Sequence, residues 1–218
     1  MEKYGTIPPK FTKDWWAHYW TYYKLHFFFG LFIAFAVGIL IHSCVTQIHY
    51  DLQVQYAAYS AQPPADTLAN FDDLIFSLCE DVTGNGKVET NTSVTVTPLA
   101  DSSPDAVQYE YAVLTKFMAQ IQASENQIYI VDKAFAEKLI AYECMLPVSE
   151  WADEVSDDLV LQNSLISLSQ NSKLSKLGFD TENLYMGVLN LQQSQMDDDE
   201  YVAKFENAKN IAHQLIKE

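Results

Sequence analysis

Residues 81–89, with the sequence DVTGNGKVE, carry oxygen-bearing groups at spacings that could bind a metal ion. The pattern partly matches the calcium loop D-x-[DN]-x-[DN]-G. The candidate ligands are Asp81, Thr83, Asn85, the carbonyl of Lys87, and Glu89. Thr92 stands where such a loop needs a bidentate carboxylate, and Asn85-Gly86 alone is a strong tight-turn signal. We therefore interpret the segment as a turn between a helix and a strand, keep weak calcium binding as the alternative, and predict no other cofactor.

The chain offers few residues for catalysis. Four of its five histidines lie in or beside an apolar segment near the N-terminus, so a Ser–His or Cys–His pair would have to use His213. We interpret His213 as a surface residue of an amphipathic helix. The acidic run 197–200 falls where that helix should begin, and the helix dipole stabilises carboxylates at that position. The sequence predicts no catalytic residue, although an envelope hydrolase using two acidic residues is kept as an alternative.

An apolar run, FFFGLFIAFAVGILI, occupies residues 27–41 and precedes the elements that would position a site. With its flanks the run reaches about 20 residues, the length of a helix that crosses a bilayer. A core helix should show a polar stripe, which this run lacks, and a signal peptide needs a cleavage site with small residues. Ser43-Cys44 resembles a lipoprotein cleavage box, but His42 fits that box poorly. The run therefore predicts an uncleaved membrane anchor.

Lysines and aromatic residues predict the orientation of this anchor. Lys3, Lys10, Lys13 and Lys24 precede the run and no lysine follows until Lys87, so the N-terminus should face the cytoplasm. Trp and Tyr residues crowd positions 15–23, where amphipathic rings settle among lipid headgroups. We divide the chain into a cytoplasmic and interfacial aromatic segment (1–24), a transmembrane helix (25–45) and an extracytoplasmic domain (46–218). The lipid bilayer of the cell membrane is the first predicted partner.

The balance of charge changes at the anchor. Of 13 basic and 29 acidic residues, four lysines and two acids lie in residues 1–45, which leaves nine lysines, 27 acids and a net charge of −18 for residues 46–218. A domain this acidic repels nucleic acid, so nucleic acid is not expected as a partner. An exported domain could pair Cys79 with Cys144 in a disulfide, and two buried thiols are the alternative.

Hydrophobic periodicity predicts a single layered α/β domain after the anchor. Strands are expected at residues 51–59, 88–99, 127–131 and 184–191, and helices at 67–80, 105–123, 133–143 and 197–218. The expected N-caps are Asp66 or Thr67 for the first of these helices and Asp132 for the third. Residues 153–177 are polar with scattered Leu and Ile and give no clear element. Alternating strands and helices with crossovers of this length predict a mostly parallel sheet.

Two stretches resemble known groups of proteins. The block WWAHYWTYYKLHFFFGLFIAFAVGILIHSCV, followed by DLQVQYAAY and EDVTGNGKVETNTSVTVTPL, resembles uncharacterised single-pass membrane proteins of anaerobic Gram-positive bacteria. The stretch from VETNTSVTVTPL through YAVLTKFMAQIQASENQIYIVDKAFAEKLI to CMLPVSEW is similar to the first lobe of extracellular solute-binding proteins. Those proteins close two lobes over a ligand, whereas this chain has room for one lobe and has Asn126-Gln127 in place of their usual Pro-Asp pair.

These observations favour an extracytoplasmic domain with an interaction or accessory binding role at the cell envelope and without catalysis. Its partner would be an unidentified envelope protein. The alternative that the resemblance implies is a membrane-tethered module that binds a small solute. In that case Trp151 and Tyr129 are the candidate residues for contacting the ligand.

Overall fold

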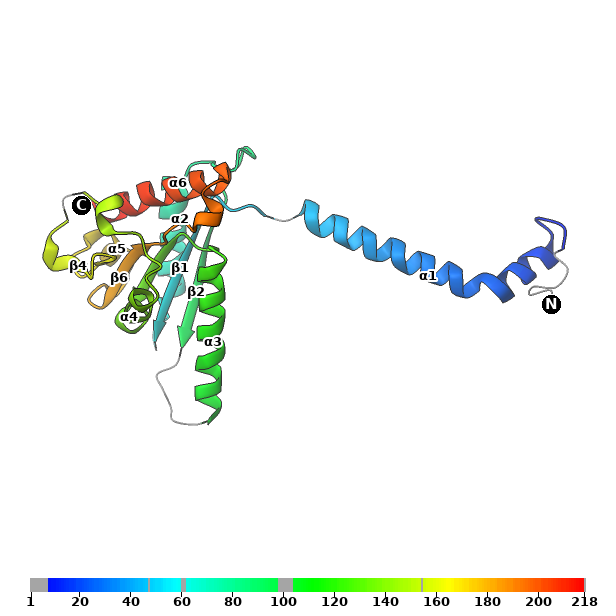
Figure 1. The fold of residues 1–218 in the computed structure, drawn as a ribbon, viewed down its shortest axis with the longest axis horizontal. Helices are drawn as coiled ribbons and strands as arrows, with labels where there is room; N and C mark the ends of the chain where they lie inside the picture. Colours follow the sequence, from blue (N-terminus) through cyan, green and yellow to red (C-terminus); the bar gives the residue numbers. More distant parts are fainter. Residues whose placement is uncertain (1–7, 47, 60–61, 98–103, 154, 218) are drawn as a thin grey trace. The chain divides into compact units, whose positions relative to one another are not determined.

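The computed structural model describes residues 8–46, 48–59, 62–97, 104–153 and 155–217, and the chain divides into two compact units, Met1–Ile48 and His49–Glu218. Helix α1 (Lys13–Val45) makes up most of the first unit (Figure 1). Thr12 caps this helix by accepting a hydrogen bond from the Trp15 N–H at 3.3 Å. The predicted apolar helix is confirmed. Its start at Lys13 precedes the predicted boundary at residue 25, because the aromatic segment is helical as well.

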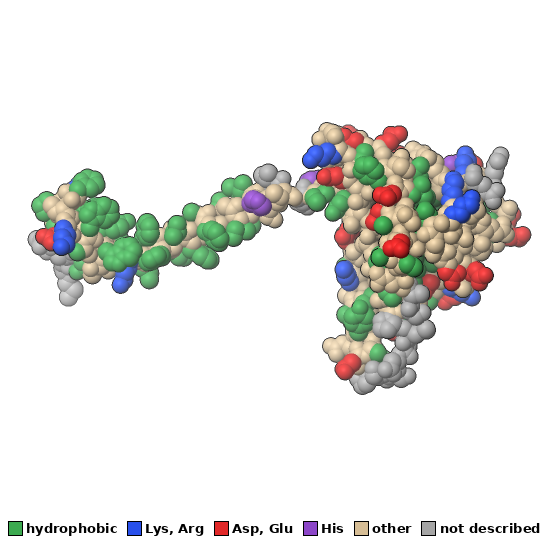
Figure 2. All heavy atoms as spheres, turned by 180° about the vertical axis from the view of Figure 1, so that it is seen from behind, with side chains coloured by type: hydrophobic (Ala, Val, Ile, Leu, Met, Phe, Trp, Pro, Cys, Tyr) green, Lys and Arg blue, Asp and Glu red, His purple; other side chains and the backbone are tan. Residues whose placement is uncertain are grey.

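Helix α1 has the length and composition of a membrane-crossing helix. Mean hydropathy reaches 2.2 within Lys13–Ser43, and none of that most apolar window is buried. Hydrophobic side chains cover the helix in Figure 2. Ahead of the apolar run, the Tyr19 ring stacks between Trp15 and Tyr23, with centroids 5.6 and 5.3 Å away. A helix that is apolar around its whole circumference needs other apolar groups around it.

The second unit is an α/β domain built on one six-stranded sheet. Its strands are β1 (Leu52–Tyr59), β2 (Thr90–Thr97), β3 (Ile128–Asp132), β4 (Val160–Leu161), β5 (Leu165–Ser167) and β6 (Leu184–Val188). The strand order is β2-β1-β3-β6-β5-β4. Strand β1 pairs in parallel with β2 and β3, whereas β6, β5 and β4 continue the sheet in antiparallel pairs. The predicted α/β fold is confirmed, with a parallel centre and an antiparallel edge.

Strands β4 and β5 lie in the segment 153–177, for which no element was predicted. Strands β4 and β5 are only two and three residues long, too short for a periodic pattern. The turn between them holds Gln162 (φ 47°) and Asn163 (φ 62°) in the left-handed region. Neither is glycine, so the usual sequence signal for such a turn is missing.

Helices cover both faces of the sheet. They are α2 (Ala65–Leu78), α3 (Pro104–Gln122), α4 (Lys133–Ala141), α5 (Ser172–Leu177) and α6 (Asp199–Ile216), with short 3-10 turns η1 (Val148–Glu150), η2 (Asp157–Leu159) and η3 (Gln193–Gln195). Alternate strand residues point to opposite faces, which separates the core into two clusters. The first cluster packs Val54 and Ile130 against α2, α5 and α6. The second packs Ala57 and Val131 against α3 and α4.

The helix starts show which cap predictions hold. Asp132 accepts a hydrogen bond from the Phe135 N–H at 2.9 Å and caps α4, as predicted. The prediction for α2 is wrong, because the helix begins at Ala65 directly after Pro64, and neither Asp66 nor Thr67 is the cap. Proline fixes φ before the first turn, so this helix starts without a side-chain cap.

Gly178→Ala should destabilise the domain more than Gly84→Ala. Both glycines have positive φ, +104° and +69°, so both changes carry the cost of a left-handed alanine, about 1–2 kcal/mol. A Cβ at Gly178 would also lie 2.6 Å from the Thr67 hydroxyl oxygen, whereas a Cβ at Gly84 meets nothing within 4 Å. Urea unfolding of the full chain in detergent measures both free energies. Equal losses would show that the contact with Thr67 is unimportant.

Candidate functional site

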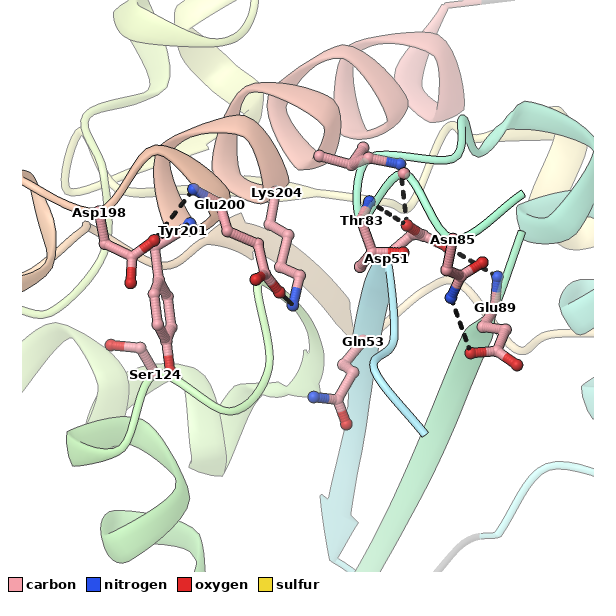
Figure 3. A network of polar contacts seen from close by, with 12 residues as sticks. Asp51, Gln53, Thr83, Asn85, Glu89, Ser124, Asp198, Glu200, Tyr201 and Lys204 are labelled. Atoms are coloured by element: carbon pink, nitrogen blue, oxygen red, sulfur yellow. Dashed lines mark hydrogen bonds and ion pairs between the residues drawn. The ribbon is translucent and has the colours of Figure 1, made fainter. Parts of the chain in front are cut away.

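A buried carboxylate organises the amino ends of the parallel strands. Asp51 directly precedes β1, is 0% exposed, and accepts hydrogen bonds from the N–H groups of Val82, Thr83 and Glu89, each at 2.8 Å (Figure 3). Its own N–H donates to the Glu89 carbonyl. Burial raises the pKa of Asp51, but the three backbone donors outweigh it and the net pKa is lowered. The ionised carboxylate therefore ties β1 to the turn that leads into β2.

The predicted turn is present at residues 81–89, and a second carboxylate shapes it. Asp81 accepts hydrogen bonds from the N–H groups of Gly84 and Gly86, both at 2.8 Å. The side-chain oxygen of Asn85 accepts a hydrogen bond from the Lys87 N–H at 2.8 Å, and the side-chain NH₂ group of Asn85 donates to the Glu89 carboxylate at 3.5 Å. Positive φ at Gly84 and Gly86 turns the backbone N–H groups inward. This turn thus uses the side chains that the calcium pattern had singled out.

The same contacts occupy the oxygens that calcium would need. Both Asp81 oxygens and the Asn85 carbonyl oxygen already accept backbone hydrogen bonds. Thr92 lies inside β2, in register with Val54, and so belongs to the sheet. Across the described residues, no three His, Cys, Asp or Glu side chains are grouped closely enough to hold a metal ion. With Thr92 in the sheet, the turn also lacks the bidentate carboxylate that such a calcium loop uses.

Beside the turn, amide side chains join the three parallel strands. The Gln53 N–H donates to the side-chain carbonyl of Gln127 at 2.8 Å, and the Gln127 N–H donates back to the Gln53 carbonyl at 2.9 Å. Gln55 is 0% exposed, and its amide oxygen accepts from Ser93 (2.6 Å) and Asn126 (3.4 Å). Sequence reasoning missed these residues. The alternation of glutamine with apolar residues predicted only a strand, and α3 and α4 cover the side of β1 on which Gln55 lies.

The start of α6 borders a polar hollow at this edge. Asp198 accepts from the N–H groups of Glu200 (3.0 Å) and Tyr201 (3.4 Å), which confirms that this part of the acidic run caps a helix. Lys204 donates to Glu200 at 2.7 Å. The hollow has a volume of about 270 Å³ and is lined by residues including Gln53, Ser124, Tyr201 and Lys204. In Figure 3 these side chains lie on one side of β1, opposite the turn held by Asp51.

The two aromatic residues proposed to contact a solute lie in separate parts of the core. Tyr129 is 0% exposed and packs edge-on against Phe117 in the second cluster. Trp151 is 5% exposed and belongs to the first cluster, on the other side of the sheet. The structure does not bring them together. Tyr129 has no surface to offer a ligand in this conformation, and Trp151 only borders a polar hollow between η1 and α6.

The two domain cysteines are free thiols. Cys79 belongs to the first cluster and Cys144 packs against the second, so the sheet separates them and the disulfide hypothesis is wrong. Burial raises the pKa of both thiols, that of Cys144 to about 11. They are therefore mainly protonated at neutral pH, and protonated thiols are poor nucleophiles.

Comparison with known proteins adds no relative. No protein family, no curated protein and no solved structure matches this chain. The resemblance to solute-binding lobes therefore stays a prediction from sequence patterns.

Asp51→Asn should lower the free energy of unfolding by about 1–3 kcal/mol, because it leaves a buried backbone N–H without an acceptor. Asp73→Asn, on the exposed side of α2, is the matched control and should cost less than about 0.5 kcal/mol.

The contribution of Asp51 to stability should depend on pH, because its pKa is lower in the folded state than in the unfolded state. This stabilisation is present above the unfolded pKa of about 3.9 and is lost as the pH falls through the folded pKa. Wild type should therefore lose more stability than the variant between about pH 5 and pH 3. Urea unfolding at several pH values measures this, and parallel pH profiles would contradict it.

Calcium at about 1 mM should raise the free energy of unfolding by less than about 0.5 kcal/mol. The reason is that a loop without its bidentate carboxylate binds calcium no tighter than roughly millimolar. Thermal melts of the full chain with calcium or with a chelator test this. A rise of several degrees that disappears in Asp81→Ala would identify the turn as a metal site.

Proposed function

We propose that this protein is anchored in a cell membrane by α1 and presents its α/β domain outside the cytoplasm as a non-catalytic binding module of the envelope. The observation that carries the proposal is α1 itself. An apolar helix of this length, with none of its apolar window buried, needs an apolar environment that its own unit does not supply. A bilayer supplies it.

The orientation is supported by charge. Lys10, Lys13 and Lys24 lie before or within the first turns of α1, and no lysine follows the apolar run until Lys87. Lysine-rich flanks stay on the cytoplasmic side when membrane helices insert. The domain after the helix would then be extracytoplasmic.

The binding role is supported by what the domain offers at its surface. Acidic side chains are spread over the face seen in Figure 2, as expected for a net charge of −18 in residues 46–218. At close range such a surface favours basic or neutral partners over acidic ones. The carboxylate with a shifted pKa, Asp51, is bound by backbone N–H groups, which suits a structural role better than proton transfer.

Protease added to intact protoplasts should remove the domain and leave a protected fragment that contains α1 and its N-terminal flank. The full chain with a C-terminal epitope tag serves as the substrate, and the tag should disappear without lysis. The matched control changes Lys10, Lys13 and Lys24 to Gln, which removes the charge bias and should leave part of the tag protected. Complete protection of the tag in wild-type protoplasts, with cleavage only after lysis, would reverse the proposed orientation.

A further inference from the structure

We propose that a groove beside α4 binds a small zwitterion with an apolar side chain, namely an apolar amino acid or a short apolar peptide. This α4 groove has a volume of about 490 Å³, within the range of small-molecule sites. The residues that matter in its lining are Lys133, Glu137, Ile140, Leu161, Gln162 and Tyr185. The inference rests on the binding role proposed above and names the ligand for it.

The floor of the α4 groove is apolar. Ile140 of α4, Leu161 of β4 and Tyr185 of β6 are each partly buried and pack against the second core cluster. Their remaining exposed surface faces a hollow that water fills in the free protein, and burying a ligand's apolar side chain there is favourable. The floor thus selects an apolar group.

The rim of the α4 groove carries one charge of each sign. Lys133 and Glu137 are one turn apart on α4, a spacing at which helix side chains can form an ion pair. Two such pairs form on α6, Lys204 with Glu200 at 2.7 Å and Lys209 with Glu206 at 2.5 Å. In the described part of the chain Lys133 and Glu137 form none, and the order Lys before Glu is the less favourable one. Their charged groups are therefore available to the carboxylate and ammonium of one ligand.

The place of the α4 groove in the fold fits a ligand site. Open α/β sheets bind ligands beyond the carboxyl ends of their strands, and the α4 groove includes Lys133 at the carboxyl end of β3. Lys133 follows the last residue of β3, and Tyr185 pairs with Val131. Asp132 accepts hydrogen bonds from the Phe135 N–H (2.9 Å) and the Tyr59 N–H (2.5 Å). The first turn of α4 is thereby held to the ends of β1 and β3.

The turn after β4 forms one wall. Gln162 and Asn163 keep left-handed φ values without being glycine, a conformation that persists only where the surroundings hold it. The Asn163 carbonyl accepts a hydrogen bond from the Val148 N–H at 2.8 Å, which fixes the turn against η1. The exposed Gln162 amide then offers a donor and an acceptor at the edge of the groove.

The charge of the domain explains why a zwitterion suits this site better than a simple anion. A net charge of −18 in residues 46–218 repels a free carboxylate ligand, whereas a zwitterion has no net charge to be repelled. A simple cation would leave Lys133 without a partner. The combination of Lys133, Glu137 and an apolar floor therefore matches the three groups of an apolar amino acid.

Isothermal titration of the full chain in detergent with leucine, phenylalanine and leucyl-leucine tests the proposal. At least one of these should bind saturably. Comparing leucine and phenylalanine with leucyl-leucine shows whether the ligand is an amino acid or a peptide. Glycine lacks the side chain, leucine methyl ester the carboxylate, and 4-methylpentanoate the ammonium, so each should bind at least tenfold more weakly. Lys133→Gln and Glu137→Gln should each weaken binding at least tenfold, while Lys116→Gln on the exposed side of α3 should leave it unchanged.

Thermal melts establish that every variant is folded before it is titrated. The proposal is overturned if folded wild type binds none of the three probes, if the ester or the acid binds as well as leucine, or if both rim variants bind like wild type. Titration in detergent does not depend on membrane orientation. A failed titration therefore leaves the protease result standing, and a reversed orientation leaves the titration standing.

Discussion

The ionised side chain of Asp51 is the contact on which the arrangement of the domain most depends. It stands where the chain enters the sheet, and it binds three backbone N–H groups of the segment that leads from α2 to β2. Strand β1 is the partner of both β2 and β3, and Asp51 holds the start of β1 to the residue that precedes β2. A neutral side chain of similar size could not satisfy all three donors. The 81–89 turn is held at its two ends by this carboxylate and is shaped between them by Asp81.

Much of the fold was predictable because its centre obeys simple periodicities. Strands β1, β2 and β3 and helices α3, α4 and α6 lie within a few residues of their expected positions, and Asp132 caps α4 as expected. Strand β6 also lies within its expected range, but β4, β5 and α5 were not predictable, since they are short and rely on tertiary contacts for their stability. Cys79 and Cys144 show the same limit. Nothing in their spacing reveals that a sheet stands between them.

The site was harder to predict than the fold, because the sequence does not show whether its aromatic and amide residues are buried or exposed. Tyr129 and Trp151 were the candidate ligand contacts of the alternative solute-binding function, yet both are buried in the core. Gln55 was part of a predicted strand, but nothing in its position indicated that its amide joins β1 to β2 and to Asn126. The α4 groove takes Lys133, Leu161 and Tyr185 from separate elements, so only the fold brings them together. Groups of this kind leave no local spacing pattern to recognise.

The strand order also sets the sequence of events during synthesis. Strand β1 emerges first but needs β2 and β3, whereas β4, β5 and β6 pair with one another nearby in the chain and join β3, which is already made. At roughly 5–20 residues per second, the interval between making Tyr59 and Asp132 is on the order of 4–15 s. During that time an apolar strand has no partner on one side, and non-local parallel pairing is slow in any case. The parallel half is therefore the part of the nascent domain most exposed to aggregation, and the antiparallel edge the part that can form as soon as it is made.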